Sequence, residues 1–173
     1  MEVRAAAQGD LAAIHAIYAH HVLRGLATFE EVPPDVEEMR RRHRDVTSLG
    51  LPYLVAVERG EILGYGYCAP YRARSAYRYA LEDSIYIKDG HLGKGIGTRL
   101  LGELLRICAG LGYRQVVAVI GDSANAGSIA LHARLGFLRV GTLRSTGYKL
   151  GRWVDSVLMQ RPLGAGDGAP PAT

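Results

Sequence analysis

The stretch Ser84-Ile85-Tyr86-Ile87-Lys88-Asp89-Gly90-His91-Leu92-Gly93-Lys94-Gly95-Ile96-Gly97-Thr98 is typical of a strand that runs through a glycine-rich turn into a helix. Residues 84–87 are mostly apolar and partly β-branched, which favours a buried strand. After the turn, apolar side chains recur at helical spacing, at Ile96, Leu100, Leu101, Leu104, Leu105 and Cys108. The sequence therefore predicts a helix that begins directly after the turn.

The glycines at 93, 95 and 97 let backbone N–H groups approach an anion without a Cβ in the way. A helix N-terminus adds unpaired N–H donors and the positive end of a dipole, which together suit a pyrophosphate. The spacing is G-x-G-x-G, so the dinucleotide fingerprint G-x-G-x-x-G is excluded, and no P-loop motif is present. A glycine-rich helix start without any ligand remains the alternative.

Length and composition favour one globular domain over residues 1–163. The chain has 173 residues, of which 48% are hydrophobic, and its mean hydropathy is +0.01. Residues 164–173 are small residues, Pro and Asp, so we expect a disordered tail. Cys68 and Cys108 lie among apolar neighbours, and no signal peptide or membrane span is visible, which favours a reduced, cytoplasmic protein.

The net charge of +4 indicates a weakly positive surface, which would favour a polyanionic cofactor. The run Arg40-Arg41-Arg42-His43-Arg44 follows acidic residues on one predicted helix and has no interleaved aromatic residues. We therefore interpret it as a solvated helix face and expect no nucleic-acid partner. His15, His20 and His21 do not share one helix face, so we expect surface histidines and no metal site.

The remaining pattern predicts alternating strands and helices. Expected strands are 3–6, 52–58, 62–69, 84–87, 115–120, 140–145 and 154–160; expected helices begin at Asp10, at Asp35 and after the glycine turn, and a fourth covers 125–135 before a terminating Gly136. Strands 52–58 and 62–69 form a hairpin at Arg59-Gly60. The loop 70–79 is rich in Tyr and Arg and is either an exposed basic loop or a carboxylate-binding loop.

The glycine turn resembles the pyrophosphate loop of the GCN5-related N-acetyltransferases (GNAT), [Arg/Gln]-x-x-G-x-[Gly/Ala]. Gly95-Ile96-Gly97 fits this consensus, while Leu92 takes the place of the Arg or Gln. The backbone amides alone must therefore bind the pyrophosphate. Four further segments resemble the phosphinothricin and methionine sulfoximine N-acetyltransferase subfamily; they are 27–34, 77–84, 125–137 and 148–155. The resemblance implies an α/β (α+β) GNAT fold, with a mixed, mostly antiparallel sheet of about seven strands and about four flanking helices.

The resemblance also implies where acetyl-coenzyme A (acetyl-CoA) binds. The backbone of Ile85, Tyr86 and Ile87 would pair with the pantetheine arm, and Asn125 would contact the arm further along. The pyrophosphate would lie on Gly93, Lys94, Gly95, Ile96, Gly97 and Thr98. The acceptor would contact Phe29, Arg72, Arg74 and Tyr79, with residues of a second subunit in a homodimer.

The chemistry follows from charge states. An α-ammonium must lose a proton before it attacks a thioester, and Glu82 on the central strand is the candidate base. Its alternative is a structural ion pair with Arg78. His132 stands where many acetyltransferases carry a Tyr that protonates the leaving thiolate; its alternative is a packed or surface histidine. The backbone N–H of Tyr86 or Ile87 would stabilise the oxyanion.

These residues predict an acetyl-CoA-dependent N-acetyltransferase that acts on the α-amine of a small amino acid or analogue, of the phosphinothricin or methionine sulfoximine or sulfone type. Two alternatives remain open at this point. One is an acetyltransferase for protein N-termini or ribosomal proteins, and the other is a non-catalytic acyl-CoA sensor that keeps the glycine turn but does not need Glu82 or His132.

Overall fold

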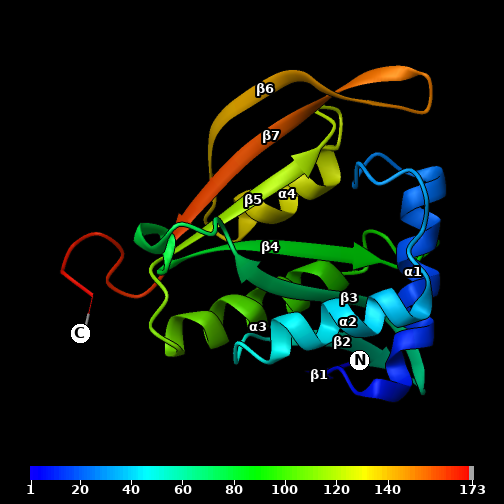
Figure 1. Ribbon diagram of the computed structural model, residues 1–173, viewed down its shortest axis with the longest axis horizontal. Coiled ribbons are helices and arrows are strands. Elements are labelled where there is room, and N and C mark those ends of the chain that lie inside the picture. The colour runs from blue at the N-terminus through cyan, green and yellow to red at the C-terminus, as the bar shows by residue number, and fades with distance from the viewer. Residues whose placement is uncertain (172–173) are drawn as a thin grey trace.

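A computed structural model describes residues 1–171 as seven strands and four α-helices around one sheet (Figure 1). In chain order these are β1 (Glu2–Ala5), α1 (Leu11–Arg24), α2 (Val36–Thr47), β2 (Tyr53–Glu58), β3 (Glu61–Pro70), β4 (Ala80–Ile87), α3 (Ile96–Gly110), β5 (Gln115–Gly121), α4 (Ala126–Arg134), β6 (Leu138–Lys149) and β7 (Arg152–Pro162). Short 3₁₀ turns lie at Gln8–Asp10 and Ser75–Tyr77.

The strands form one sheet in the order β1-β2-β3-β4-β5-β7-β6. Among the strands that the structure describes, only the pair of β4 and β5 is parallel, and every other neighbouring pair is antiparallel. The predicted fold class, a mixed and mostly antiparallel sheet with four helices, is confirmed.

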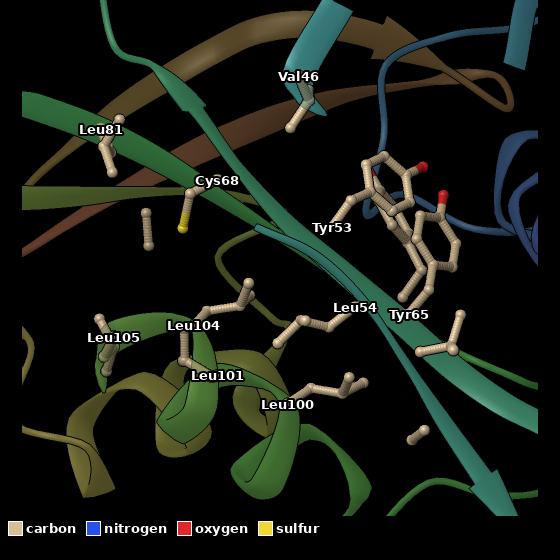
Figure 2. Packing of buried hydrophobic residues seen from close by; sticks show 14 of the residues in the cluster. Val46, Tyr53, Leu54, Tyr65, Cys68, Leu81, Leu100, Leu101, Leu104 and Leu105 are labelled. Atoms are coloured by element: carbon tan, nitrogen blue, oxygen red, sulfur yellow. The ribbon is translucent and has the colours of Figure 1, made fainter. Parts of the chain in front are cut away.

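Helices cover both faces of the sheet. On one face, Tyr53 and Tyr65 pack against α1 and α2, and on the other face the leucines of α3 lie under the same strands (Figure 2). Leu100, Leu101 and Leu104 are fully buried. Each buried leucine contributes about 1.5–3 kcal/mol of transfer free energy, so α3 is anchored firmly at its apolar face.

A fork in the sheet positions the functional site. β4 pairs with β5 only from Ala80 to Asp83, opposite Gln115 to Ala118. Beyond Asp83, β4 stays paired with β3, whereas β5 continues along β7 as far as Gly121. From Ser84 onward, no strand of residues 1–171 pairs with the β5 side of β4, so its backbone groups on that side are available to another partner.

Most of the turns and helix caps that the sequence predicts are present in the structure. Arg59 and Gly60 both have positive φ, 50° and 80°, as a two-residue hairpin turn requires. Asp35 caps α2 by accepting from Glu38 N–H at 2.8 Å, and Gly136 follows α4 at φ 84°. Asp10 was the exception, because its carboxylate accepts from Arg4 at 2.7 Å and does not cap α1.

The β6–β7 hairpin is longer than predicted and extends past the end of β5 (Figure 1). Leu150 and Gly151 form a tight turn with φ of 51° and 76°, so pairing continues up to Lys149 and Arg152. Much of β6 is exposed, and its mixed side chains gave no alternating pattern from which its full length could be predicted.

Residues 164–171 run as turns beyond β7. Arg114 donates to the carbonyl oxygens of Gly166 at 3.3 Å and Pro170 at 3.0 Å. The disorder expected for 164–173 stays a prediction, and its last two residues lie outside the described residues. In the described part of the chain, every helix is too short or too polar to cross a bilayer.

Gly121 at the end of β5 allows the segment after α1 to approach the sheet. A Cβ at Gly121 would lie 2.1 Å from the carbonyl oxygen of Leu26, a backbone atom that a side-chain rotation cannot remove. We expect Gly121→Ala to lower the free energy of unfolding by about 1–3 kcal/mol in urea denaturation. Gly141→Ala, in the open strand β6, is the matched control and should change it by less than about 0.5 kcal/mol; equal effects would contradict this account.

Candidate functional site

A cavity of about 690 Å³ lies beside the fork. Its wall combines the segment after α1, the free edge of β4, the glycine turn, the end of β5 and the face of α4. Among the predicted cofactor residues, it is lined by Ile85, Ile87, Gly93, Gly95, Ile96, Gly97, Thr98 and Asn125. The structure therefore brings together residues that are 40 positions apart in the sequence.

The glycine turn is built to bind an anion. Gly93 and Gly95 have φ of 75° and 77°, a left-handed conformation that other residues rarely adopt. The first bond of α3 runs from Arg99 N–H to Gly95 O at 3.2 Å, so the preceding N–H groups of the first turn have no partner within the helix. Leu92 lines the cavity with an exposed apolar side chain, and Lys94 does not line it.

Two arginines that the sequence analysis did not single out stand at this cavity. Arg24 ends α1 and Arg134 ends α4, and both line the cavity. Among the described residues, neither forms a salt bridge or a side-chain hydrogen bond, whereas Arg41, Arg42 and Arg106 are paired with carboxylates. Unpaired cations beside a turn of free amides fit a ligand with several phosphates. No sequence pattern separated these two from other exposed arginines.

The free edge of β4 is partly used by His21, which corrects the prediction of a surface histidine. His21 is half-buried and donates from Nε2 to Ile87 O at 2.8 Å. Burial lowers the pKa of His21, although the bond to Ile87 opposes this, so the ring is neutral at pH 7. Ile85 and Ile87 face the cavity, while Tyr86 faces the other side of the sheet and packs edge-on against Tyr18 at 5.0 Å.

Asn125 begins α4 and lines the cavity. Its side-chain oxygen accepts from Ser128 N–H at 3.1 Å, so it acts as the N-cap of the helix. Its amide nitrogen remains near Gly121 O at 3.5 Å. The residue that was predicted to contact the coenzyme therefore also fixes the end of α4 that borders the cavity.

Glu82 stands at the fork, on the face of β4 opposite the cavity isoleucines. Burial raises the pKa of Glu82, and the charge of Arg72 offsets part of that rise. In the part of the chain that the structure describes, Glu82 forms no ion pair. Arg78 instead donates to Ser75 O at 3.2 Å and stacks over the ring of Tyr79, so the alternative of a Glu82–Arg78 pair is wrong.

Phe29 lies at the carboxyl end of β5. A Cβ at Gly147 would come within 2.6 Å of its ring, and a Cβ at Gly121 within 3.3 Å, so the ring rests on two glycines. The segment is held by Lys149, whose buried ammonium donates to Thr28 O at 2.7 Å.

The loop 70–79 lies at the other end of the β4–β5 pair. Tyr79 O accepts from Arg114 N–H at 2.9 Å, just before β5 begins. Arg72 and Arg74 are exposed, and Arg72 stacks over the ring of Tyr71. The structure thus brings Arg72 toward Glu82 but does not bring Phe29 and this loop together within one chain.

His132 lies behind the cavity wall, with 3% of the residue exposed. Its Nε2 is 3.0 Å from Asp83 Oδ2, and its Nδ1 is 2.7 Å from Ser128 O. Burial alone would lower the pKa of His132, but the hydrogen bond and charge of Asp83 outweigh burial and raise it. His132 does not line the cavity, and its role as an acid stays a prediction.

The described residues hold no group of three or more His, Cys, Asp or Glu side chains that could bind a metal ion. The absence of a metal from the working protein stays a prediction.

The forked sheet, the anion-binding turn at a helix N-terminus and the half-buried carboxylate at the fork together define an acetyltransferase architecture. The chain belongs to the GNAT family, because the model of the "Acetyltransferase (GNAT) family" matches residues 14–137.

Comparison with individual proteins confirms the predicted subfamily. The chain is 56% identical over 165 residues to a phosphinothricin N-acetyltransferase of Alcaligenes faecalis, which covers 95% of this chain and 84% of the relative. It is 37% identical over 163 residues to an L-methionine sulfoximine/L-methionine sulfone acetyltransferase of Salmonella typhimurium, covering 94% and 95% of the two chains.

Solved structures agree with this placement. A GNAT superfamily phosphinothricin acetyltransferase from Sinorhizobium meliloti, in complex with AcCoA, superposes with a TM-score of 0.96 at 48% identity and covers 99% of this chain and 92% of its own. A ribosomal-protein-alanine N-acetyltransferase from Brucella melitensis has a TM-score of 0.91 at 36% identity, covering 94% and 100%.

Proposed function

We propose that this chain transfers the acetyl group of acetyl-CoA to the α-amine of a small amino-acid analogue of the phosphinothricin or methionine sulfoximine or sulfone type. The observation that carries the proposal is the 56% identity, over 95% of the chain, with a relative named phosphinothricin N-acetyltransferase. Glu82 at the fork and the cavity on the other face of β4 support it, because they offer a base and a coenzyme site on either side of one strand.

The residues around the cavity fit acetyl-CoA, which supplies an acetyl thioester when bound. The N–H groups of the turn from Gly93 to Thr98 would hold the pyrophosphate, and the free edge of β4 at Ile85, Tyr86 and Ile87 would pair with the pantetheine arm. Asn125 borders the arm. The amide-rich turn and the unpaired arginines are the observation that supports the fit to a polyanion.

On the acceptor side, Glu82 would remove a proton from the α-ammonium. Burial raises the pKa of Glu82, which makes its carboxylate a stronger base than that of an exposed glutamate. The N–H of Tyr86 or Ile87 would stabilise negative charge that develops on the acyl oxygen. Phe29, Arg72, Arg74 and Tyr79 would contact the acceptor.

We infer a homodimer, because Phe29 and the Arg loop lie at opposite ends of the strand pair and a second copy would supply the missing side. Exposed apolar side chains on β6, on β7 and in the turn between them support this inference; they are Leu138, Val140, Leu143, Tyr148, Leu150 and Trp153. We also propose a cytoplasmic location, which the two buried free cysteines support. Residues 1–163 would form a single domain.

The experiment that tests the function is thiol release from acetyl-CoA with a panel of amines. The panel holds phosphinothricin, methionine sulfoximine, methionine sulfone, ordinary amino acids and a peptide with a free N-terminus. We expect turnover with phosphinothricin, methionine sulfoximine and methionine sulfone, and little with the peptide. Coenzyme binding without turnover on any amine would contradict the proposal and favour an acyl-CoA sensor.

A second candidate function is acetylation of a protein N-terminus. The similarity to the ribosomal-protein-alanine N-acetyltransferase, at 36% identity, is the observation that favours it. Activity confined to the peptide in the same panel would select this function.

Arg24 and Arg134 provide a prediction about the coenzyme. We expect Arg24→Gln and Arg134→Gln each to raise the KM for acetyl-CoA by about two- to fivefold, because each removes one exposed cation from the phosphates. The effect should shrink at high salt. Arg106→Gln, on the outer surface of α3, is the control and should leave the KM for acetyl-CoA unchanged. An unchanged KM in all three variants would contradict the assignment of Arg24 and Arg134 to the phosphate site.

A further inference from the structure

The tip of the β6–β7 hairpin lies against the chain segment between α1 and α2. β7 pairs with β5 up to Ser156, and residues 144–155 continue as a two-stranded tip. A two-stranded hairpin is marginally stable by itself, so contacts outside the sheet must fix this tip. One such contact runs from the Ser123 hydroxyl to the Asp155 carboxylate at 2.8 Å, and the same carboxylate accepts from Ser145 N–H at 2.9 Å.

Lys149, the last residue of β6, places its ammonium group inside the protein. The residue is 2% exposed. Its Nζ donates to Thr28 O at 2.7 Å and to His21 O, in the last turn of α1, at 3.5 Å. In the part of the chain that the structure describes, the ammonium forms no ion pair. Carbonyl oxygens at a helix C-terminus carry partial negative charge, so the end of α1 and the Thr28 carbonyl take the place of a carboxylate.

The buried charge of Lys149 requires the Thr28 carbonyl to stay in place. Burial lowers the pKa of Lys149, and the charges of Glu31 and Glu30 oppose this. If the backbone at Thr28 moved away, the ammonium would remain buried without its main hydrogen-bond acceptor, which is costly for a charged group. The bond therefore ties one backbone position between the two helices to the tip of the hairpin.

Thr28 and Phe29 are also held from other sides. The Thr28 hydroxyl shares a hydrogen bond with the Tyr18 hydroxyl at 3.0 Å and accepts from Glu30 N–H at 3.3 Å. The ring of Phe29 rests on Gly147, two residues before Lys149, where a Cβ would come within 2.6 Å of it. The hairpin tip therefore contacts this part of the chain twice, through the ammonium at Thr28 and through the open glycine beneath Phe29.

Residues 25–30, the 25–30 segment, also form part of the coenzyme cavity. Residues 25–27 line the cavity directly before Thr28. His21 lines it as well; its ring donates to Ile87 O at 2.8 Å, while its carbonyl oxygen faces the buried ammonium. A shift of the backbone at Thr28 would therefore move Phe29 directly and the cavity wall by a smaller amount.

We propose that Lys149 is a positioning residue, which holds the 25–30 segment through Thr28 so that Phe29 meets the acceptor. The inference rests on the proposed function, in which Phe29 contacts the acceptor. Lys149 does not line the coenzyme cavity, so it acts through the segment and not on the reacting atoms.

The kinetic test is Lys149→Met, which removes the charge and the N–H donors but keeps a long, unbranched side chain. We expect the KM for phosphinothricin to rise by about tenfold or more, because a hydrogen bond from a charged group is lost and the segment moves. The KM for acetyl-CoA and kcat should change by less than about threefold, since the glycine turn and Glu82 are untouched. Lys88→Met is the matched control, because Lys88 is half-exposed and paired with Glu61, and it should change none of these constants.

A spectroscopic test follows the position of Phe29 directly. The sequence has two phenylalanines, Phe29 and Phe137, so labelling with 4-fluorophenylalanine gives two ¹⁹F resonances, which Phe29→Leu assigns. Phe137 is buried beside His132 and serves as the internal reference. We expect Lys149→Met to shift or broaden the Phe29 resonance and to leave that of Phe137 in place, a difference that a general loss of stability would not produce.

Gly147→Ala is the second variant, and it remains informative if Lys149→Met does not fold. Its Cβ displaces the ring of Phe29 while the ammonium stays in place, so it should also raise the KM for phosphinothricin. An unchanged Phe29 resonance or an unchanged KM for phosphinothricin in Lys149→Met would overturn the proposal, as would an unchanged KM in Gly147→Ala. A wild type without turnover on any amine would contradict the proposed function, while the ¹⁹F spectra would still test whether Lys149 positions Phe29.

Discussion

Replacing Glu82 with Gln should lower kcat by about 10²–10⁴ while the KM for acetyl-CoA stays nearly constant. Gln has the same shape but cannot take a proton from the α-ammonium, and Glu82 faces away from the coenzyme cavity. Because the charged form of Glu82 is the active form and burial raises its pKa, activity should fall on acidification above the pH range in which an ordinary glutamate titrates. Steady-state kinetics between pH 5 and 9 would measure both effects.

Glu61→Gln is the matched control. Glu61 is an exposed carboxylate at the start of β3, paired with Lys88, and its loss should leave kcat unchanged. Undiminished turnover in Glu82→Gln would remove Glu82 from the chemistry, and loss of the acidic limb only in that variant would support its role.

Gly95→Val should raise the KM for acetyl-CoA by about 10–100-fold with a smaller effect on kcat. Gly95 has φ 77°, which a β-branched residue does not adopt without strain, so the turn must reorganise and its N–H donors turn away from the cavity. Losing one hydrogen bond to a charged group costs about 1.5–3 kcal/mol, which corresponds to the expected change. Isothermal titration with coenzyme A would measure the binding loss directly.

Gly50→Val is the control that separates backbone strain from the loss of coenzyme binding. Gly50 has φ 72° and, like Gly95, open space around a built Cβ, but it lies in the turn after α2 and does not line the cavity. Both variants should lower the melting temperature by similar amounts, and only Gly95→Val should weaken coenzyme binding. Equal affinities in the two variants would contradict the assignment of the turn as the phosphate site.

The fold was largely predictable because its elements carry local signals. The leucine spacing of α3, the Arg59-Gly60 turn and the Asp35 cap each depend on residues close in sequence. The length of the β6–β7 hairpin was underestimated, because an exposed edge strand has no buried face that would require alternating apolar and polar residues. The prediction that Asp10 caps α1 was wrong because of a tertiary contact, since Arg4 on β1 binds the Asp10 carboxylate.

The residues that motifs singled out lie together at the cavity, and the contacts that only the fold creates were missed. Asn125 and the glycine turn, apart from Lys94, line the cavity, and their contact with the coenzyme stays a prediction. His21 looked like any exposed helix histidine, because the sequence does not show that its ring meets the Ile87 carbonyl, 66 positions away. The bond between Asp83 and His132 likewise joins two elements 49 positions apart, so only the fold reveals that the imidazole is paired.

The most direct test of the central claim is mass spectrometry of the products when phosphinothricin and a peptide with an N-terminal alanine compete for limiting acetyl-CoA in one reaction. The account predicts that the acetyl group is found on the α-nitrogen of phosphinothricin, with the peptide left almost unmodified. Acetylation of the peptide in preference to phosphinothricin would contradict it.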